Sequence, residues 1–293
     1  MGARSWRRYG ATTAAVVTTV MAAAACTSSG EIGVGANADR SVDRKVDLNS
    51  VTAAQAVKDA GQAAAARHTV RIHTVTTAKD YVTTVDGLQR TDRFAEDLTA
   101  VSKHQGVQAA AQAETRGDGS TLYVDEPGLP AADRGGRTWV KLDLGHLPPP
   151  TSTTPGASMF ADLGAAYQHD DPGQAALFPL ACPDLHKVGV ETKDGRPAVH
   201  VIGTATPATL AAPAGSGLTQ DYVDFRRQMM QKNQTSKISF DLWIGADGLP
   251  VESVETDSWA SGDVVSDTTL TQWGVSFTVA PPPAADTYVL PGT

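Results

Sequence analysis

Asp-Gly occurs four times in this chain, each time between two stretches whose composition is typical of β-strands. A two-residue hairpin turn needs positive φ, which Gly adopts freely and Asp tolerates, and its twist matches a pair of antiparallel strands. Each hairpin also fixes the register of the strands that it joins. The repeated dipeptide therefore predicts an antiparallel meander, with turns at Asp86-Gly87, Asp118-Gly119, Asp194-Gly195 and Asp247-Gly248.

Apolar and polar residues alternate along several predicted strands, as expected of a sheet with one buried and one solvent-facing side. Residues 138–144 and 237–244 place Trp139 and Trp243 on the solvent-facing side, and residues 272–279 alternate in the same way. The apolar positions of the first two stretches are Val140, Leu142, Leu144, Ile238, Phe240, Leu242 and Ile244. Further strands are expected at 69–77, 81–85, 88–94, 97–102, 107–115, 185–192, 196–204, 251–257 and 264–270, with a short edge strand at 288–290. The Ala-rich residues 107–113 fit a helix equally well and are assigned to a strand because of their neighbours.

Two stretches have the periodicity of amphipathic helices. Residues 51–67 follow Asn49 and Ser50, either of which is a suitable N-cap. Residues 218–232 are the most amphipathic stretch, because apolar residues recur with helical spacing at Leu218, Tyr222, Phe225 and Met229. Two shorter helical pieces are expected at about 157–168, with Phe160 and Leu163 on one side, and around 174–180.

The N-terminal residues 1–25 have the features of a removable export signal. Three arginines and no acidic residue precede the small apolar stretch 11–25, which is too short for an ordinary transmembrane helix. Cys26 follows Ala23-Ala24-Ala25 and resembles the lipidated cysteine of a bacterial lipobox, whereas the alternative is a secretory signal with a chance cysteine. The expected organisation is a signal peptide at 1–25, a lipidated N-terminus and flexible tether at 26–49, and one domain at 50–293. Export by the Sec or the twin-arginine route stays open.

Charge and motifs argue against several classes of function. Loss of the three leader arginines lowers the net charge from −8 to −11, and this acidic balance argues against nucleic-acid binding. No nucleophile-elbow, zinc-protease, C-x-x-C or P-loop pattern occurs, so neither catalysis nor a cofactor is expected. The cluster His169-Asp170-Asp171 is interpreted as a solvated loop and not as a metal site. Glu252 and Glu255 are expected to be exposed, and Cys182 to be a small buried side chain with no disulfide partner.

The order of these features resembles a known group of proteins. The segments STLYVDEPG, GRTWVKLDL, HKVGVETKDGRPAVHVIGTA and SKISFDLWIGADGLPVESVE, with a helix before the last one, are similar to actinobacterial lipoproteins of the LolA-like superfamily, the group of LppX, LprA, LprF and LprG. The resemblance covers most of residues 50–280. It implies an α+β fold: a strongly curved antiparallel sheet, a half-open barrel, with helices on its concave face. It also implies that lipid or acyl chains bind between the sheet and the helices.

The resemblance and the residues together leave two classes of function. The first is a lipoprotein on the outer face of the cytoplasmic membrane that binds or carries lipid in an apolar cavity. The second is a regulatory lipoprotein, of the kind of RseB-like sensors, that acts on a membrane protein partner through its convex face. The candidate cavity residues are Val140, Leu142, Phe160, Leu163, Tyr222, Phe225, Met229, Ile238, Phe240 and Leu242. Each buried methylene of an acyl chain would contribute about 0.8 kcal/mol. A filled core is the preferred interpretation for any single one of these residues, and a cavity lining is expected for a subset of them.

Overall fold

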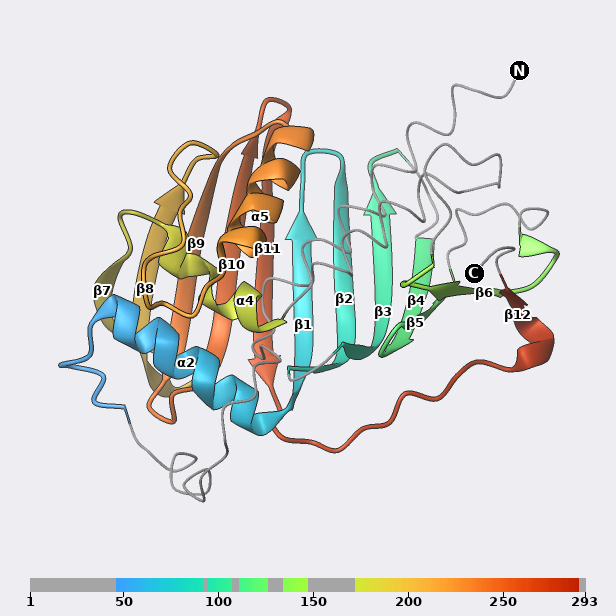
Figure 1. Ribbon diagram of the computed structural model, residues 1–293, viewed down its shortest axis with the longest axis horizontal. Helices are drawn as coiled ribbons and strands as arrows, with labels where there is room; N and C mark the ends of the chain where they lie inside the picture. The colour runs from blue at the N-terminus through green and yellow to red at the C-terminus, as the bar shows by residue number, and fades with distance from the viewer. Residues whose placement is uncertain (1–45, 92–93, 107–110, 126–133, 147–171, 290–293) are drawn as a thin grey trace.

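The computed structural model describes residues 46–91, 94–106, 111–125, 134–146 and 172–289 (Figure 1). The described residues form one sheet of 12 strands, three α-helices and two short 3-10 helices. The helices are α2 (Ala53–Arg67), α4 (Pro172–Leu177), η4 (Phe178–Ala181), α5 (Gln220–Lys232) and η5 (Ala284–Asp286). The strands are β1 (Thr69–Thr77), β2 (Tyr81–Arg90), β3 (Ala95–His104), β4 (Ala111–Asp118), β5 (Thr121–Asp125), β6 (Trp139–Asp143), β7 (His186–Lys193), β8 (Arg196–Ala205), β9 (Thr235–Gly245), β10 (Pro250–Trp259), β11 (Gly262–Thr271) and β12 (Thr287–Val289).

The sheet is open and almost wholly antiparallel. Its strand order is β12-β6-β5-β4-β3-β2-β1-β11-β10-β9-β8-β7, so two meanders are joined through the pair β1–β11, and only β12 runs parallel to its neighbour β6. The strand direction turns from near vertical in β1 to near horizontal in β6, and α2, α4 and α5 lie on the same face (Figure 1). The predicted fold class, a curved antiparallel sheet that is not closed and carries helices on one face, is confirmed.

Three of the four Asp-Gly sites are hairpin turns, at β4–β5, β7–β8 and β9–β10. At the β7–β8 turn both Asp194 and Gly195 have positive φ, of 48° and 74°. The prediction of a turn at Asp86-Gly87 is wrong, because both residues lie inside β2, paired with His73 and Ile72. A Cβ on Gly87 would lie 2.1 Å from the carbonyl oxygen of Asp97, so this glycine is explained by close packing on β3 and not by a turn.

The strand predicted at 272–279 does not form. Gln272 and Gly274 have positive φ, of 49° and 81°, which interrupts an extended backbone directly after β11. Side-chain and backbone bonds hold the segment instead: the Trp273 indole donates to the carbonyl oxygen of Pro250, and the Thr69 hydroxyl donates to that of Val275. The short edge strand expected near residue 288 is present as β12.

The two long helices start later than predicted. Thr52, and not Asn49 or Ser50, caps α2, because its hydroxyl accepts the backbone N–H of Gln55. Thr219 caps α5 by accepting the N–H of Tyr222, so Leu218 lies before the helix. The helical piece predicted at 157–168 lies outside the described residues, and the piece around 174–180 is present as α4 followed by η4.

The face of the sheet opposite the helices is less exposed to solvent than the alternation of apolar and polar residues predicts. Trp139 and Trp243 lie on that face but are buried. The Arg116 guanidinium lies 4.8 Å from the ring centroid of Trp139. The His200 ring stacks on Trp243 at 4.2 Å, with its two nitrogens each 2.9 Å from a carboxylate oxygen, one of Glu191 and one of Asp241. Polar side chains thus cover the two indoles, which alternation alone assigns to solvent.

Candidate functional site

The helix-facing surface of the sheet, meaning the side on which α2, α4 and α5 lie, contains the strand residues predicted to line a lipid site. On β6, Val140 and Leu142 are fully buried. On β9, Ile238, Phe240 and Leu242 are also buried. Of the other predicted residues, Tyr222 is buried on α5 and Phe225 and Met229 are half-buried there. Cys26, Phe160 and Leu163 lie outside the described residues.

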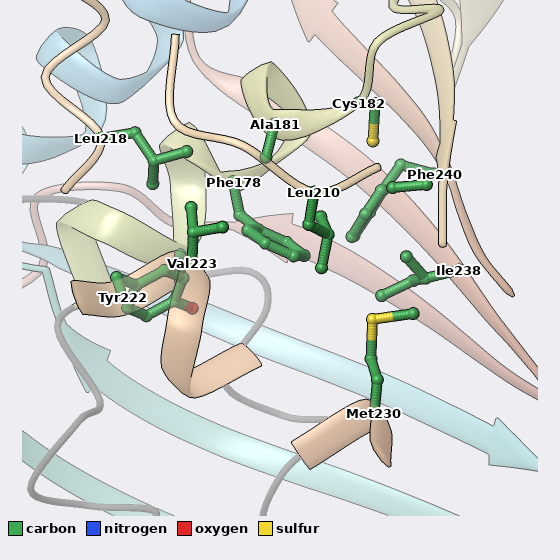
Figure 2. Packing of buried hydrophobic residues seen from close by; sticks show 12 residues of the cluster. Phe178, Ala181, Cys182, Leu210, Leu218, Tyr222, Val223, Met230, Ile238 and Phe240 are labelled. Carbon is green, nitrogen blue, oxygen red and sulfur yellow. The ribbon is translucent and has the colours of Figure 1, made fainter. Parts of the chain in front are cut away.

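The structure brings Tyr222, Ile238 and Phe240 into one apolar cluster, with Phe178 of η4 between helix and sheet (Figure 2). The Phe178 ring meets Tyr222 and Phe240 edge-on, with centroid separations of 5.8 Å and 5.5 Å. Such edge-to-face pairs are favourable contacts of packed cores. The space between these α5 and β9 residues is therefore occupied by an aromatic side chain from η4, which the sequence does not indicate.

A second cluster lies beside the first along β9. Leu242 and Ile244 pack there against α2, through residues such as Val57 and Ala60, and against Val199 of β8. The helix α2 is rich in alanine, and small side chains let its backbone approach the sheet closely. Phe240 and Leu242, both candidate cavity residues, therefore lie in different clusters, Phe240 with residues of α5 and Leu242 with residues of α2.

The buried face of α5 differs from the predicted one. Tyr222, Val223, Arg226 and Met230 are its buried residues, whereas Met229 is only half-buried. The observed face keeps Tyr222 but continues through Arg226 and Met230, each one residue after the predicted Phe225 and Met229, and Leu218 precedes the helix. At 100° per residue, Phe225 and Met229 lie on one flank of Tyr222, and Val223 and Met230 on the other.

Arg226 is the charged residue on this buried face, and it is paired. Its Nη2 donates to Oε1 of Glu255 at 2.7 Å, and its guanidinium lies 4.4 Å from the ring centroid of Phe178. Both side chains of the pair are almost fully buried, with 10% and 5% of their surfaces exposed. The expectation that Glu255 is exposed is therefore wrong. Glu255 lies directly opposite Phe240 on the neighbouring strand, which places it on the helix-facing surface.

Further polar groups lie next to this ion pair. Asp257 follows Glu255 on the same face of β10, and burial, together with the charge of Glu255, raises the pKa of Asp257 to about 7 against the opposing effect of Arg226. Burial, and then the charge of Asp257, raises the pKa of the Tyr81 phenol. Seven buried side-chain atoms in the described part of the chain have no hydrogen-bond partner, and three of them are Glu255 Oε2, Tyr81 Oη and Trp259 Nε1.

A row of side chains crosses five strands in register and ends at Glu255. We call it the polar row, and its members are Ser102 (β3), Thr83 (β2), Thr76 (β1), Ser266 (β11) and Glu255 (β10). The hydroxyls of Thr83 and Ser102 bond each other at 2.9 Å, and those of Thr76 and Ser266 at 3.1 Å. A five-strand row of this kind comes from distant parts of the chain, so only the sheet order reveals it.

An apolar patch adjoins the polar row on the helix-facing surface. It is a cluster of buried residues from β1, β2, β3 and β11, namely Val70, Ile72, Val85, Leu98 and Leu270. The same side of the sheet continues over β5 and β6 to Val140 and Leu142. This half of the sheet thus presents apolar side chains beside a line of hydroxyls and carboxylates.

The remaining reactive candidates have structural explanations. Cys182 is buried in the apolar cluster that contains Tyr222, Ile238 and Phe240, here called the α5 cluster. Burial raises the pKa of its thiol to about 12, which suppresses the nucleophilic thiolate. In the ranges that the structure describes, no group of three or more His, Cys, Asp or Glu side chains is placed to hold a metal ion. The cluster His169-Asp170-Asp171 falls outside those ranges. No described helix has both the length and the apolar character that crossing a membrane requires.

Comparisons with known proteins found bacterial relatives of low identity. No family model matches the chain. An uncharacterized 31.2 kDa protein of Streptomyces griseus is 26% identical over 198 residues, which is 62% of this chain and 60% of the relative. A Streptomyces coelicolor protein described as a "putative lipoprotein" is 27% identical over 169 residues, 56% of this chain and 47% of the relative. The chain therefore spans less than two thirds of either relative. The second relative confirms the resemblance to actinobacterial lipoproteins that the sequence predicts.

Three solved structures are also similar to this chain. LprF from Mycobacterium bovis has a TM-score of 0.43 and 16% identity, covering 78% of this chain and 96% of its own. Lipoprotein LppX from Mycobacterium tuberculosis has a TM-score of 0.46 and 13% identity, covering 78% and 98%. A LolA superfamily protein from Nitrosomonas europaea has a TM-score of 0.24 and 13% identity, covering 80% and 97%. All three TM-scores are below 0.5, and the site is therefore interpreted from this chain's own residues.

Proposed function

We propose that this protein is a membrane-anchored lipoprotein that binds acyl chains on the helix-facing surface of its sheet and catalyses no reaction. One observation carries the proposal. The described helices make their main sheet contacts with β7, β8 and β9, yet the other half of the sheet also has buried apolar side chains on the same face. No described helix lies over β2 to β6 in Figure 1. The apolar side chains of a sheet face need a cover, and those of this half are at most 6% exposed. We assign part of that cover to acyl chains in the lipid-bound protein.

The residues predicted to line the lipid site have different proposed roles: some contact the ligand, and others form the core that supports the site. Val140 and Leu142 belong to the apolar half of the sheet and would contact the ligand. Phe225 and Met229 lie on the flank of α5 away from Val223 and Met230, and we assign them to the facing wall. Tyr222, Ile238, Phe240 and Leu242 pack against α2, η4 and α5, and in the described structure they act as the core that supports the site. The unbranched thioether of Met229 suits a wall that must adapt to chains of different shape.

The proposed anchor is a diacylated Cys26 on the outer face of the cytoplasmic membrane, with residues 26–45 as a tether. The predicted tether is shortened from 26–49, because Leu48 is buried against α2 and Lys187 donates to the carbonyl oxygens of Leu48 and Asn49. A lipobox-like sequence supports this assignment, and so does the description of the S. coelicolor relative as a lipoprotein. A single acyl chain gives only marginal membrane binding, so the two or three chains of a bacterial lipoprotein would be required. The acidic net charge gives no electrostatic attraction to anionic lipid, which leaves the acyl chains to hold the protein.

Mass spectrometry of lipids that co-purify with the protein from its native membrane tests the proposal. We expect acyl lipid in a fixed stoichiometry with the parent protein. Replacing Met229 with Trp should lower the lipid content while the melting temperature stays close to that of the parent, because the side chain is only half-buried. The control is Gln228→Trp, at an exposed neighbouring position of the same helix, which should leave the lipid content unchanged. A parent protein free of lipid would contradict the proposal.

One observation favours a second function. Phe178 fills the contact between Tyr222 and Phe240, as a protein with a solid core and no ligand would require. A regulatory lipoprotein that acts on a membrane partner, in the manner of RseB-like sensors, needs no cavity. Absence of lipid, together with a membrane protein that crosslinks to the parent chain in native membranes, would favour this function over lipid binding.

A further inference from the structure

The polar row and its neighbours are placed to select one class of lipid. The row crosses the helix-facing surface beside the apolar patch of β1, β2, β3 and β11, so a lipid whose chains lie on the patch brings its head to the row. Four members of the row, namely Thr76, Thr83, Ser266 and Glu255, are buried. Each hydrogen-bonded hydroxyl pair uses one of its two protons, so each pair keeps one O–H to offer.

Glu255 supplies a buried acceptor at the end of the row. Its side chain is 5% exposed, and Oε1 is occupied by Arg226 while Oε2 has no partner among the described residues. An unsatisfied buried carboxylate oxygen is costly, and a hydroxyl of a bound molecule would satisfy it. Elsewhere on the helix-facing surface, Trp259 Nε1 of β10 and Tyr81 Oη of β2 are buried donors without a described hydrogen-bond partner, and ester carbonyls would accept from them.

The charges around this site disfavour an anionic head. Glu255 and Asp257 provide two carboxylates on one face of β10, and Arg226 is the guanidinium that faces them. Because Arg226 already donates to Glu255 and stacks on Phe178, it is committed to the protein. A lipid phosphate at the row would add negative charge beside Glu255 in a buried environment, where like charges repel strongly.

We propose that the lipid bound by this protein has an uncharged, hydroxyl-bearing glycerol ester head, as in a diacylglycerol, and that Glu255 and Asp257 exclude anionic phospholipids. The hydroxyl donates to Glu255 Oε2, the ester carbonyls accept from Trp259 and Tyr81, and the acyl chains lie on the apolar patch. This inference rests on the proposed lipid-binding function and gives it a substrate class.

Three fluorescent probes with the same acyl chains test the inference on the purified full-length lipoprotein at pH 8. They are a diacylglycerol, the corresponding phosphatidic acid and the corresponding triacylglycerol, which lacks the hydroxyl. We expect the diacylglycerol to bind about tenfold more tightly than either of the others, since a site built around a hydroxyl discriminates against analogues that leave its acceptor unpaired. Binding of none of the probes overturns the proposed function together with this inference. Equal affinities for all three probes overturn only the inference.

Two variants test whether Asp257 and Trp259 determine the preference for diacylglycerol. Asp257→Asn removes one carboxylate with little change of side-chain shape, and it should raise the ratio of the affinity for phosphatidic acid to the affinity for diacylglycerol. Trp259→Phe removes one donor and should weaken diacylglycerol binding roughly threefold to tenfold. The matched control is Glu252→Gln, because Glu252 lies on the same strand but points to the opposite face, where it pairs with Lys193. If Glu252→Gln changes the preference as much as Asp257→Asn does, net charge and not this site sets the selectivity, and the inference is wrong.

Discussion

At the scale of single residues, the buried charges on β10 have consequences beyond ligand binding. Arg226 and Glu255 are each taken out of water, and their mutual bond offsets a desolvation cost that neither residue would bear alone. Asp257 is the third member of the group and has no arginine of its own. Its ionisation therefore places an uncompensated negative charge between α5 and the sheet.

The first prediction is a pH dependence of stability that comes from Asp257. Its pKa is raised from 3.8 to about 7 in the folded protein, so its contribution to stability is complete below pH 3.8 and is lost as the pH rises toward 7. Between pH 5 and pH 8 the parent should lose roughly 1–3 kcal/mol more than Asp257→Asn. Glu255, Arg226 and Tyr81 are the titratable groups coupled to it. Melting curves of both proteins at the two pH values measure the difference, and parallel shifts would contradict the prediction.

The second prediction concerns the β7–β8 turn. Gly195 has φ of 74°, and no atom lies within 4 Å of the point that a Cβ would occupy, so a substitution there strains the backbone without a clash. Gly195→Val should destabilise the fold by roughly 1–3 kcal/mol, because a β-branched residue adopts positive φ poorly. Gly189→Val on the adjacent strand β7 is the control, since Gly189 also has open space but lacks positive φ. Urea unfolding measures both, and equal loss would show that the turn geometry is not responsible.

The Asp-Gly dipeptide shows which structural features cannot be predicted from the sequence. Asp194-Gly195 and Asp86-Gly87 look alike in the sequence, and local turn chemistry predicts a hairpin at each. The first is a turn, while the second lies inside β2, where Leu98 and the carbonyl of Asp97 leave no room for a side chain. A glycine that is needed for positive φ and a glycine that is needed for close packing cannot be distinguished in the sequence. Only the tertiary structure shows which of the two reasons applies.

At the scale of elements, the short helices α4 and η4 organise the contact between α5 and the sheet. The sequence predicts a helical piece here but does not indicate its role. Phe178 can lie between α5 and β9 only because the tertiary fold places η4 there, and no local pattern predicts that placement. Phe178 is 1% exposed and contacts aromatic rings from both α5 and β9. The helix α5 therefore contacts η4 as well as β9.

The third prediction tests this arrangement. Phe178→Ala should cost about 3–5 kcal/mol, as expected for a large aromatic side chain removed from a packed core. Phe225→Ala removes the same side chain from the half-buried flank of α5 and should cost about 1 kcal/mol. Chemical denaturation of the two variants gives both values. A small loss for Phe178→Ala would indicate a loosely packed interface under α5, with room for a ligand there.

At the scale of the whole molecule, the sheet combines predictable and unpredictable pairings. Alternation and hairpin turns predict neighbours along the chain, and the meanders β1–β5 and β7–β11 follow from them. The pair β1–β11 joins two strands from nearly opposite ends of the domain's sequence. The parallel pair β12–β6 also joins strands that are far apart in the sequence. No local pattern specifies such pairings, because they depend on which edges remain free once the hairpins have formed. The polar row, which crosses the β1–β11 junction at Thr76 and Ser266, is beyond prediction for the same reason.

The last prediction concerns the attachment of the whole molecule to the membrane. Cys26→Ser removes the thiol that would be acylated, and the protein should then move from the membrane fraction to the culture medium. The expected shift is nearly complete, because multiple acyl chains hold a protein far more firmly than one chain does, and an acidic protein without them has no electrostatic attachment to anionic lipid. Cys182→Ala is the matched control: its thiol is buried in the α5 cluster, so its loss should leave the protein on the membrane. Immunoblots of the two fractions measure the distribution. Retention of the Cys26→Ser protein on the membrane would show that another segment or a partner holds it there, and the anchor assignment would be wrong.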